Sequence, residues 1–449
     1  MQNFLGSVWW MLVTLGLLIT FHEFGHFVVA RRLGVRVLRF SIGFGRPLLS
    51  RVGRDGTEYV LAAIPLGGYV KMLDEREGAV APEEVHLAFN RKPLGARTAI
   101  VAAGPAFNLI FTVFALWLMF VFGKPDFLPL VGRTQGIAAE AGFARGDRLV
   151  EVGGRPVSTW SEASLALATR SLDRDPLPIR VIDGVGAERL RTLSFAKLPS
   201  NGEPASLRAL GFNVRQFELP ALIGAVAPDS PAAAAALRVG DRVVELAGMR
   251  IATFDQLAER MQVQTAGSPV AIVVERDGGL ERLTVVPRGE TAEDGTKVIR
   301  IGVGPQPAQA RHDTEQRYGP LAAIPAAVRE TWQMTRDTYA ILGKLLTGRA
   351  SLSNISGPIS IAQFANTSAN MGFAWFLSFL AMVSLSLAVM NLLPIPILDG
   401  GHLLYYLIEL VKGSPVTERT LAVGQFIGLA MLVGLMGLAF YNDIFRQFS

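Results

Sequence analysis

Three side chains that could carry out chemistry stand inside an apolar stretch near the start of the sequence. His22, Glu23 and His26 lie in LGLLITFHEFGHFVVARRLG, residues 15–34. Residues four positions apart lie one above the other on a helix face, so both imidazoles can bind one ion. A glutamate beside such a pair can take a proton from metal-bound water, which begins metal-dependent hydrolysis. The spacing predicts a metal centre with a general base next to it.

The apolar surroundings of this trio make an idle role improbable on energetic grounds. An acidic side chain at the centre of a lipid-embedded helix costs about 2.5–3.5 kcal/mol on insertion scales. Such groups therefore face the protein interior or a wet cavity and mark functional sites. A chance HExxH is common in soluble helices, and inside an apolar span a purely structural polar network is the alternative that remains.

A third ligand is expected from a late segment, NLLPIPILDGGH, residues 391–402. A catalytic zinc needs three protein ligands and one open position. The chain has no cysteine, which leaves His, Asp and Glu as strong ligands. Pro394 and Pro396 cannot continue a helix, and Asp399 follows directly after this break. Broken helices at membrane depth are tolerated where they line a cavity. His402 is the alternative ligand, and is otherwise a packing residue around the site.

These residues need a membrane-spanning scaffold, and the composition predicts one. Half of the residues are hydrophobic, and the mean hydropathy is +0.35. Four apolar runs are long enough to cross a hydrocarbon core of about 30 Å. They are Leu5–Ala30, Ala99–Phe122, Gly372–Leu393 and Leu421–Tyr441. The first run ends on Arg31 and Arg32 rather than at a small-residue cleavage site, so we expect a transmembrane helix and no removable signal peptide.

The basic residues set the expected orientation. The loop after the first run is rich in Arg and Lys, so the positive-inside rule places it in the cytoplasm and both termini outside. The first and third runs then both run inward, which brings His22, His26 and Asp399 to the same cytoplasmic side. The net charge of +5 is mostly this topogenic bias, and no nucleic-acid partner is expected because no separate basic domain exists.

The region between the second and third runs repeats itself. GIAAEAGFARGDRLVEVGGRPV (136–157) aligns without a gap on SPAAAAALRVGDRVVELAGMRI (230–251), so that Gly146-Asp147-Arg148 falls on Gly240-Asp241-Arg242. This predicts two copies of one αβ domain. The pattern resembles PDZ domains, which bind extended peptides by adding a strand to a sheet edge. The alternative is that both copies are rigid spacers.

Two further segments have a periodic pattern. VRVLRFSIGFG and TEYVLAAIPLGGYVKM alternate apolar and other residues, which predicts a β-hairpin over Val35–Met72 on the cytoplasmic side, dipping into the bilayer. Apolar residues from Leu321 to Leu346 recur at steps of three and four, with Arg329, Arg336 and Lys344 off that stripe. This indicates an amphipathic helix on the membrane surface or against the bundle, and ordinary core packing explains the pattern equally well.

The chain combines HExxH in a first span with a late NxxPxPxLDG. This combination resembles the site-2 protease family of M50-type intramembrane zinc metalloproteases. With the PDZ-like repeat included, the resemblance covers essentially the whole chain. It implies zinc ligands at His22, His26 and Asp399 and a catalytic base at Glu23. It also implies substrate-binding positions, which are Asn391, Pro394, Pro396, Gly43 and Gly45. SGPISIA (356–362) likewise matches a family stretch. We found no departure at a catalytic position.

The resemblance further implies hydrolysis of peptide bonds within the membrane segments of single-span proteins. The expected substrates are an anti-sigma factor already cut on its outer side and remnant signal peptides, in an envelope stress response at the bacterial inner membrane. The zinc site would lie towards the cytoplasm, and the PDZ-like copies, binding peptides or outer domains, in the periplasm. The alternatives are a membrane-anchored PDZ scaffold without catalysis and a metal-ion transporter. A transporter would need further ionisable residues in its spans, and Ala99–Phe122 has none.

The expected fold is therefore a polytopic α-helical membrane protein with four transmembrane helices, a membrane-associated β-hairpin and two αβ PDZ-like domains. The predicted segments, in chain order, are a first transmembrane helix with HExxH (1–34), the β-hairpin region (35–97), a second transmembrane helix (98–124), the first and second PDZ-like domains (125–218 and 219–306), an amphipathic helix with a linker (307–371), a third transmembrane helix with the NxxPxPxLDG segment (372–419) and a fourth transmembrane helix (420–449).

Overall fold

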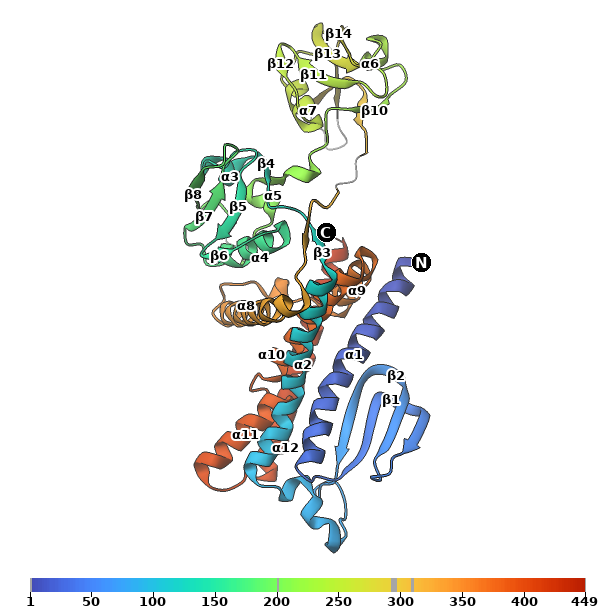
Figure 1. The fold of residues 1–449 in the computed structure, drawn as a ribbon, viewed down its shortest axis with the longest axis vertical. Helices are drawn as coiled ribbons and strands as arrows, with labels where there is room; N and C mark the ends of the chain where they lie inside the picture. The colour runs from blue at the N-terminus through green and yellow to red at the C-terminus, as the bar shows by residue number, and fades with distance from the viewer. Residues whose placement is uncertain (1, 200–201, 292–296, 308–310, 449) are drawn as a thin grey trace. The chain divides into compact units, whose positions relative to one another are not determined.

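The computed structural model describes residues 2–199, 202–291, 297–307 and 311–448, and it divides into two compact units. Unit 1 comprises Met1–Pro125, Pro199–Pro204 and Glu315–Ser449, and unit 2 comprises Asp126–Leu198 and Ala205–Thr314. Figure 1 labels the elements of both units. Unit 1 contains the long helices and the β-ribbon, and it holds every predicted site residue.

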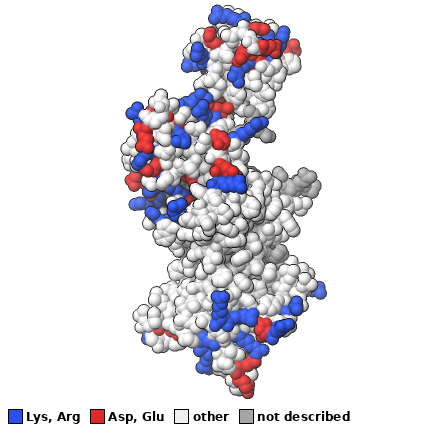
Figure 2. Space-filling view, viewed as in Figure 1, with Lys and Arg blue, Asp and Glu red and all other residues white. Residues whose placement is uncertain are grey.

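Four helices of unit 1 are long and apolar enough to cross a membrane. They are α1 (Gln2–Arg32), α2 (Leu94–Phe122), α10 (Phe373–Asn391) and α12 (Glu418–Phe448). They coincide with the four runs predicted from hydropathy. On the face seen in Figure 2, the described surface over the middle of these helices carries no Lys, Arg, Asp or Glu, and charged side chains gather at the end of unit 1 near the β-ribbon. An uncharged band of this kind suits a helix bundle in lipid.

Helices α1, α2 and α10 pack into one apolar core. Its fully buried members include Leu18 of α1, Leu116 of α2 and Ala381 of α10. The crossing of α1 and α2 is so close that a Cβ on Gly25 would lie 2.5 Å from the carbonyl oxygen of Ala103. Only glycine allows this approach, which brings the HExxH segment directly against α2.

The predicted hairpin is present as an antiparallel ribbon of β1 (Val37–Val52) and β2 (Glu58–Met72), drawn beside α1 in Figure 1. The strands curl, so that residues 39–42 of β1 have partners on both sides, in Glu58–Leu61 and in Gly68–Lys71. Among the described residues, Gly68–Met72 pairs with no strand on its other side. This part of β2 is therefore an edge, and it packs against α1. Two 3₁₀ turns, Pro82–Leu87 and Phe89–Arg91, connect the ribbon to α2.

The predicted amphipathic segment forms α8 (Pro320–Leu346), and it is followed by α9 (Pro358–Met371), which the sequence pattern did not predict. The α9 N-terminus is capped from a distant helix. The Asp443 carboxylate of α12 accepts hydrogen bonds from the backbone N–H groups of Gly357 (2.9 Å), Ile359 (2.8 Å) and Ser360 (3.0 Å). A carboxylate at these positions satisfies free N–H groups of the first turn and complements the helix dipole.

A second helix that the pattern missed is α11 (Asp399–Lys412), which begins at the expected third ligand. The double glycine makes this possible. A Cβ on Gly400 would lie 2.2 Å from the carbonyl oxygen of Leu393, and one on Gly401 would lie 2.3 Å from that of Ile395. The helix can therefore restart directly beside the proline break, and Asp399 is fixed at its first residue.

Unit 2 contains the two repeats, and each has a four-stranded sheet with the same strand order. In the first repeat the order is β6 (Arg155–Pro156), β5 (Arg148–Val152), β7 (Leu177–Ile182) and β8 (Glu188–Leu193); in the second it is β12 (Met249–Arg250), β11 (Arg242–Leu246), β13 (Val270–Arg276) and β14 (Gly279–Val285). Each repeat has its own apolar core. The gapless alignment of the two copies therefore reflects one topology used twice.

The helices and remaining strands of the repeats are short. They are β4 (Val131–Thr134), α3 (Gly136–Glu140), α4 (Trp160–Ser171), α5 (Leu207–Leu210), β9 (Phe212–Val214), β10 (Ile223–Val226), α6 (Pro231–Ala234), α7 (Phe254–Gln262), β15 (Arg288–Thr291), β16 (Lys297–Arg300) and β17 (Val303–Pro305). Outside the repeats, β3 (Lys124–Asp126) and β18 (Thr314–Gln316) form a two-stranded sheet of their own. The Gly-Asp turns have matching geometry, with φ of +96° at Gly146 and +95° at Gly240. The aspartates that follow, Asp147 and Asp241, are both buried.

Candidate metal centre

The structure brings His22, His26 and Asp399 together, with one ligand atom of each within 4.8 Å of the others. Asp399 Oδ2 lies 3.1 Å from His22 Nε2 and 3.6 Å from His26 Nε2. The two Nε2 atoms are 3.2 Å apart. Two helices that are far apart in the sequence, α1 and α11, therefore meet at one point inside unit 1.

The donor set fits a zinc ion. In a tetrahedral site with Zn–N and Zn–O bonds of about 2.0–2.1 Å, ligand atoms lie about 3.3 Å apart, close to the separations seen here. Asp399 Oδ2 is buried and accepts no hydrogen bond of acceptable geometry. A buried carboxylate oxygen without a donor is costly unless a cation lies beside it. Two imidazoles and one carboxylate leave the fourth position open, as hydrolytic zinc sites require.

Helix α2 orients both imidazoles from behind. His26 Nδ1 lies 2.8 Å from the Ile100 carbonyl oxygen, which can only accept, so the proton is on Nδ1 and the Nε2 lone pair is free. Asn108 Nδ2 lies 3.4 Å from His22 Nδ1, while Asn108 Oδ1 is buried without a donor. Amide oxygen and nitrogen positions are interchangeable assignments. Turned by half a rotation, Asn108 Oδ1 accepts from His22 Nδ1–H, which satisfies both groups and frees His22 Nε2.

Gly104 of α2 makes room for the metal ligands. A Cβ at this position would lie 2.3 Å from His26 Nε2 and 2.7 Å from His22 Cε1. Any side chain would therefore displace both rings. The sequence interpretation missed Ile100, Gly104 and Asn108. The available signal was AAGPAFN, residues 102–108, which places a Gly-Pro pair and an asparagine inside an apolar span.

Glu23 lies beside the ligands and faces the β-ribbon. It lines the same cavity as His26, Asp399 and Val70 of β2. A Cβ on Gly68 would lie 3.5 Å from Glu23 Cγ and 2.6 Å from the Ser41 carbonyl oxygen. The glycine thus lets the ribbon edge approach the predicted base, a contact that no local pattern could have indicated.

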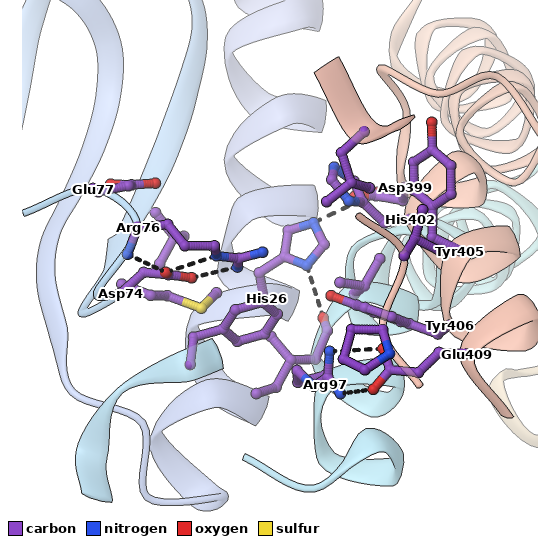
Figure 3. Close-up of a pocket in the computed structure, with 18 of the residues that line it drawn as sticks. His26, Asp74, Arg76, Glu77, Arg97, Asp399, His402, Tyr405, Tyr406 and Glu409 are labelled. Carbon is purple, nitrogen blue, oxygen red and sulfur yellow. Dashed lines mark hydrogen bonds and ion pairs between the residues drawn. The ribbon is translucent and has the colours of Figure 1, made fainter. Parts of the chain in front are cut away.

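The ligands open into a polar cavity of about 370 Å³. Figure 3 shows His26 near the centre of the view with Asp399 beside it. Two ion pairs lie around them, Asp74–Arg76 from the ribbon side and Arg97–Glu409 between α2 and α11. Burial raises the pKa of Asp74, but hydrogen bonds from the Arg76 side chain and amide lower it below its usual range. The cavity therefore has charged walls, which suit water and a peptide more than lipid.

The remaining predicted residues lie outside this cavity or only line it. His402 lines the cavity one turn after Asp399, yet it is not part of the ligand cluster among the described residues. Asn391 is the last residue of α10, and the two prolines lie in the break that follows. None of the five predicted substrate-binding positions is among the described residues that line the cavity; they are Asn391, Pro394, Pro396, Gly43 and Gly45.

Comparison with known proteins identifies a protease family and similar chains. The model of peptidase family M50 matches residues 10–435. A Xylella fastidiosa (strain 9a5c) protein named as a zinc metalloprotease is 49% identical over 99% of this chain and 100% of its own length. The regulator of sigma-E protease RseP of Escherichia coli (strain K12) is 42% identical over 99% of this chain and 100% of its own. A PDZ domain of a Listeria monocytogenes SdrC-like protein matches 19% of this chain and 84% of its own length, with 20% identity and a TM-score of 0.17.

Proposed function

The chain belongs to peptidase family M50, and from that premise we propose that it is a zinc metalloendopeptidase that hydrolyses peptide bonds within transmembrane segments. The observation that supports this most is the convergence of His22, His26 and Asp399 beside Glu23. Their positions on or directly after membrane-length helices would put the chemistry at membrane depth. A zinc ion held by these ligands would lower the pKa of a water to about 7 and polarise a peptide carbonyl.

Each residue at the site would then have a separate role in peptide-bond hydrolysis. The Glu23 carboxylate takes a proton from the attacking water and later gives it to the leaving amine. Val70 of the β2 edge lines the same cavity as this carboxylate. The Ile100 carbonyl keeps the proton of His26 on Nδ1, and Gly104 leaves the space in which both imidazoles turn towards Asp399. This arrangement keeps the imidazoles oriented before substrate arrives.

The β2 edge offers a site for the substrate backbone. A helical peptide bond is protected by its own hydrogen bonds, so the substrate must unwind before hydrolysis. In our proposal the free side of Gly68–Met72 pairs with the unwound chain by strand addition. Val70 and Met72 of this edge line the metal cavity. The similarity to the family supports assigning substrate contacts to Asn391, Pro394 and Pro396, and to Gly43 and Gly45 at the far part of the ribbon.

The substrate class follows from the relatives. The similarity to regulator of sigma-E proteases supports single-span anti-sigma factors, already cut on their outer side, as substrates, with remnant signal peptides as a second class. Cleavage would release a transcription signal for envelope stress. The Arg- and Lys-rich loop after α1 supports an inner-membrane orientation with the metal centre towards the cytoplasm, and with both termini and the PDZ-like repeats in the periplasm.

The PDZ-like repeats would then act as a filter for substrates. Folded outer domains would be excluded and shortened substrates admitted, with exposed peptide ends bound by strand addition. The alternative of an inactive PDZ scaffold is not favoured, because such a protein has no use for a base aligned with three metal ligands.

The decisive experiment compares wild type with Glu23→Gln on a model single-span substrate. Glu23→Gln removes the base and preserves the ligands, so the purified variant should contain the same zinc as wild type and cleave at least about 100-fold more slowly. Wild-type cleavage rates in this variant would refute the assignment of Glu23. Absence of cleavage by wild type, with zinc bound, would favour the scaffold.

A further inference from the structure

One face of α2 supports the whole metal centre. Arg97, Ile100, Gly104 and Asn108 are spaced by three or four residues and so lie on the same side of the helix. The last three contact the imidazoles from behind, as described above. The first, Arg97, contacts neither imidazole. It reaches α11, the helix that begins with the third ligand.

Arg97 forms a bidentate ion pair with Glu409 of α11. Arg97 donates from one terminal nitrogen to Glu409 Oε1 (2.5 Å) and from the other to Glu409 Oε2 (3.2 Å). Its Nε donates to the Lys92 carbonyl oxygen at 3.1 Å. The guanidinium also lies over the Tyr406 ring, 5.1 Å from the centroid. Both charged side chains are only 15% exposed, so the pair is fixed in one geometry.

Helix α11 is well placed to transmit this constraint to Asp399. Asp399 is its first residue, and no side chain caps this helix end. Glu409 lies about 15 Å further along the helix, and both residues line the metal cavity. The opposite face of α11 is apolar and exposed, as at Leu407, Leu410 and Val411. Thus the polar face of α11 is the one fastened to α2.

We propose that the Arg97–Glu409 pair is a positioning device for Asp399: it holds α11 against α2 so that the carboxylate reaches the two imidazoles that α2 already orients. This inference rests on the proposed function, because it assigns the pair a role in zinc binding. Neither residue touches the ligands, so both act through the helix. The pair differs from an ordinary structural ion pair in that its loss should weaken the metal site before it unfolds the protein.

The expected size of the effect follows from the geometry. Removing one partner of a buried pair leaves the other charge uncompensated and releases the helix. Loss of groups that support metal ligands typically weakens metal binding about 10- to 100-fold. Arg97→Gln and Glu409→Gln should each weaken zinc binding by at least about 10-fold. The charge-exchanged double variant R97E/E409R should recover most of that loss.

The test is a zinc titration of purified full-length protein in detergent against a chromophoric chelator, with far-UV circular dichroism as a check on folding. The matched control is Arg276→Gln, which breaks a comparably buried ion pair with Asp241 in the second repeat. The control should bind zinc as tightly as wild type. A cycle with Asp399→Ala isolates the mechanism: if Arg97 acts through Asp399, Arg97→Gln should weaken zinc binding no further in the Asp399→Ala background.

Each outcome decides the matter. Three results would overturn the positioning role. The two single variants could bind zinc as tightly as wild type, or R97E/E409R could lose as much zinc affinity as the single variants do. The losses of zinc affinity caused by Arg97→Gln and Asp399→Ala could also be additive. If Arg97→Gln does not fold, Arg97→Lys retains the charge but cannot form the bidentate pair, and it should bind zinc more weakly than wild type. Unchanged zinc affinity in Arg97→Lys would then overturn the positioning role. Wild type that binds no zinc would overturn the proposed function instead, so the two failures are distinguishable.

Discussion

His26 Nδ1 lies 2.8 Å from the carbonyl oxygen of Ile100, a residue on another helix and 74 positions later in the chain. This contact fixes the tautomer of one proposed metal ligand by a backbone group. It depends on the close crossing of α1 and α2 at Gly25. The metal centre is therefore a property of two packed helices and a restarted third, rather than of the HExxH segment alone.

Replacement of Gly104 by alanine should disable the site. The new Cβ would lie 2.3 Å from His26 Nε2 and push both rings out of position. We expect zinc content and cleavage rate below about a tenth of wild type. The matched control is Gly95→Ala in the same helix, where a Cβ meets no atom within 4 Å. Both can be measured by metal analysis and a cleavage assay. Equal behaviour of the two variants would show that the space at Gly104 is not needed.

The β2 edge should matter most for substrates that must be unwound. Proline substitutions across Gly68–Met72 remove backbone donors that strand addition uses. They should slow cleavage of a stably helical substrate about 10-fold or more. Cleavage of a substrate with helix-breaking residues at the scissile bond should slow much less. Ser50→Pro, at the opposite and exposed end of the ribbon, serves as the control. Equal slowing of both substrates would argue against an unwinding edge.

Deletion of the repeats should change which substrates are cut. If they act as a filter, a variant in which Leu130–Pro305 is replaced by a flexible linker should cleave substrates that still carry their outer domain. Already shortened substrates should be cleaved at similar rates by both proteins. The measurement is the ratio of the two rates in reconstituted vesicles. A ratio identical to that of wild type would rule out the filter.

The second repeat should lose stability in acid through Asp241. Burial raises the pKa of this carboxyl, but hydrogen bonds from Arg276 and from the Arg238 amide outweigh it and hold the pKa below its usual range. A carboxyl whose pKa is lower in the folded state stabilises the folded protein at pH values above its unfolded-state pKa, about 3.9. This stabilisation is lost as the pH falls through the folded-state pKa. Amide hydrogen exchange in β11 and β13 should therefore be slower in wild type than in Asp241→Asn at pH 7. Near pH 2 the two proteins should show the same protection. A constant difference would contradict this linkage.

The sequence could predict the three candidate ligands that the structure brings together, because their chemistry is local. HExxH places two imidazoles on one helix face, and the proline break marks the place where Asp399 can leave a helix. The four helices long and apolar enough to cross a membrane follow from hydropathy. The gapless repeat predicts one topology used twice, and the two four-stranded sheets have the same strand order.

The supporting contacts could not be predicted, because each depends on how separate elements pack. Gly104 matters only because α2 crosses behind the histidines, and Gly68 only because β2 approaches Glu23. Helix α11 was missed because the pattern indicated the break but not the restart that Gly400 and Gly401 allow. Helix α9 was missed because its cap comes from Asp443, far along the chain.

The measurement that tests the central claim most directly is the zinc content of purified wild type, His22→Ala, His26→Ala and Asp399→Ala. If one ion is held jointly by α1 and α11, wild type should contain one equivalent of zinc per chain, and each variant should lose most of it after dialysis against a weak chelator. Wild-type zinc content in Asp399→Ala would contradict the account, because the carboxylate that α11 carries to the two imidazoles would then not be a ligand.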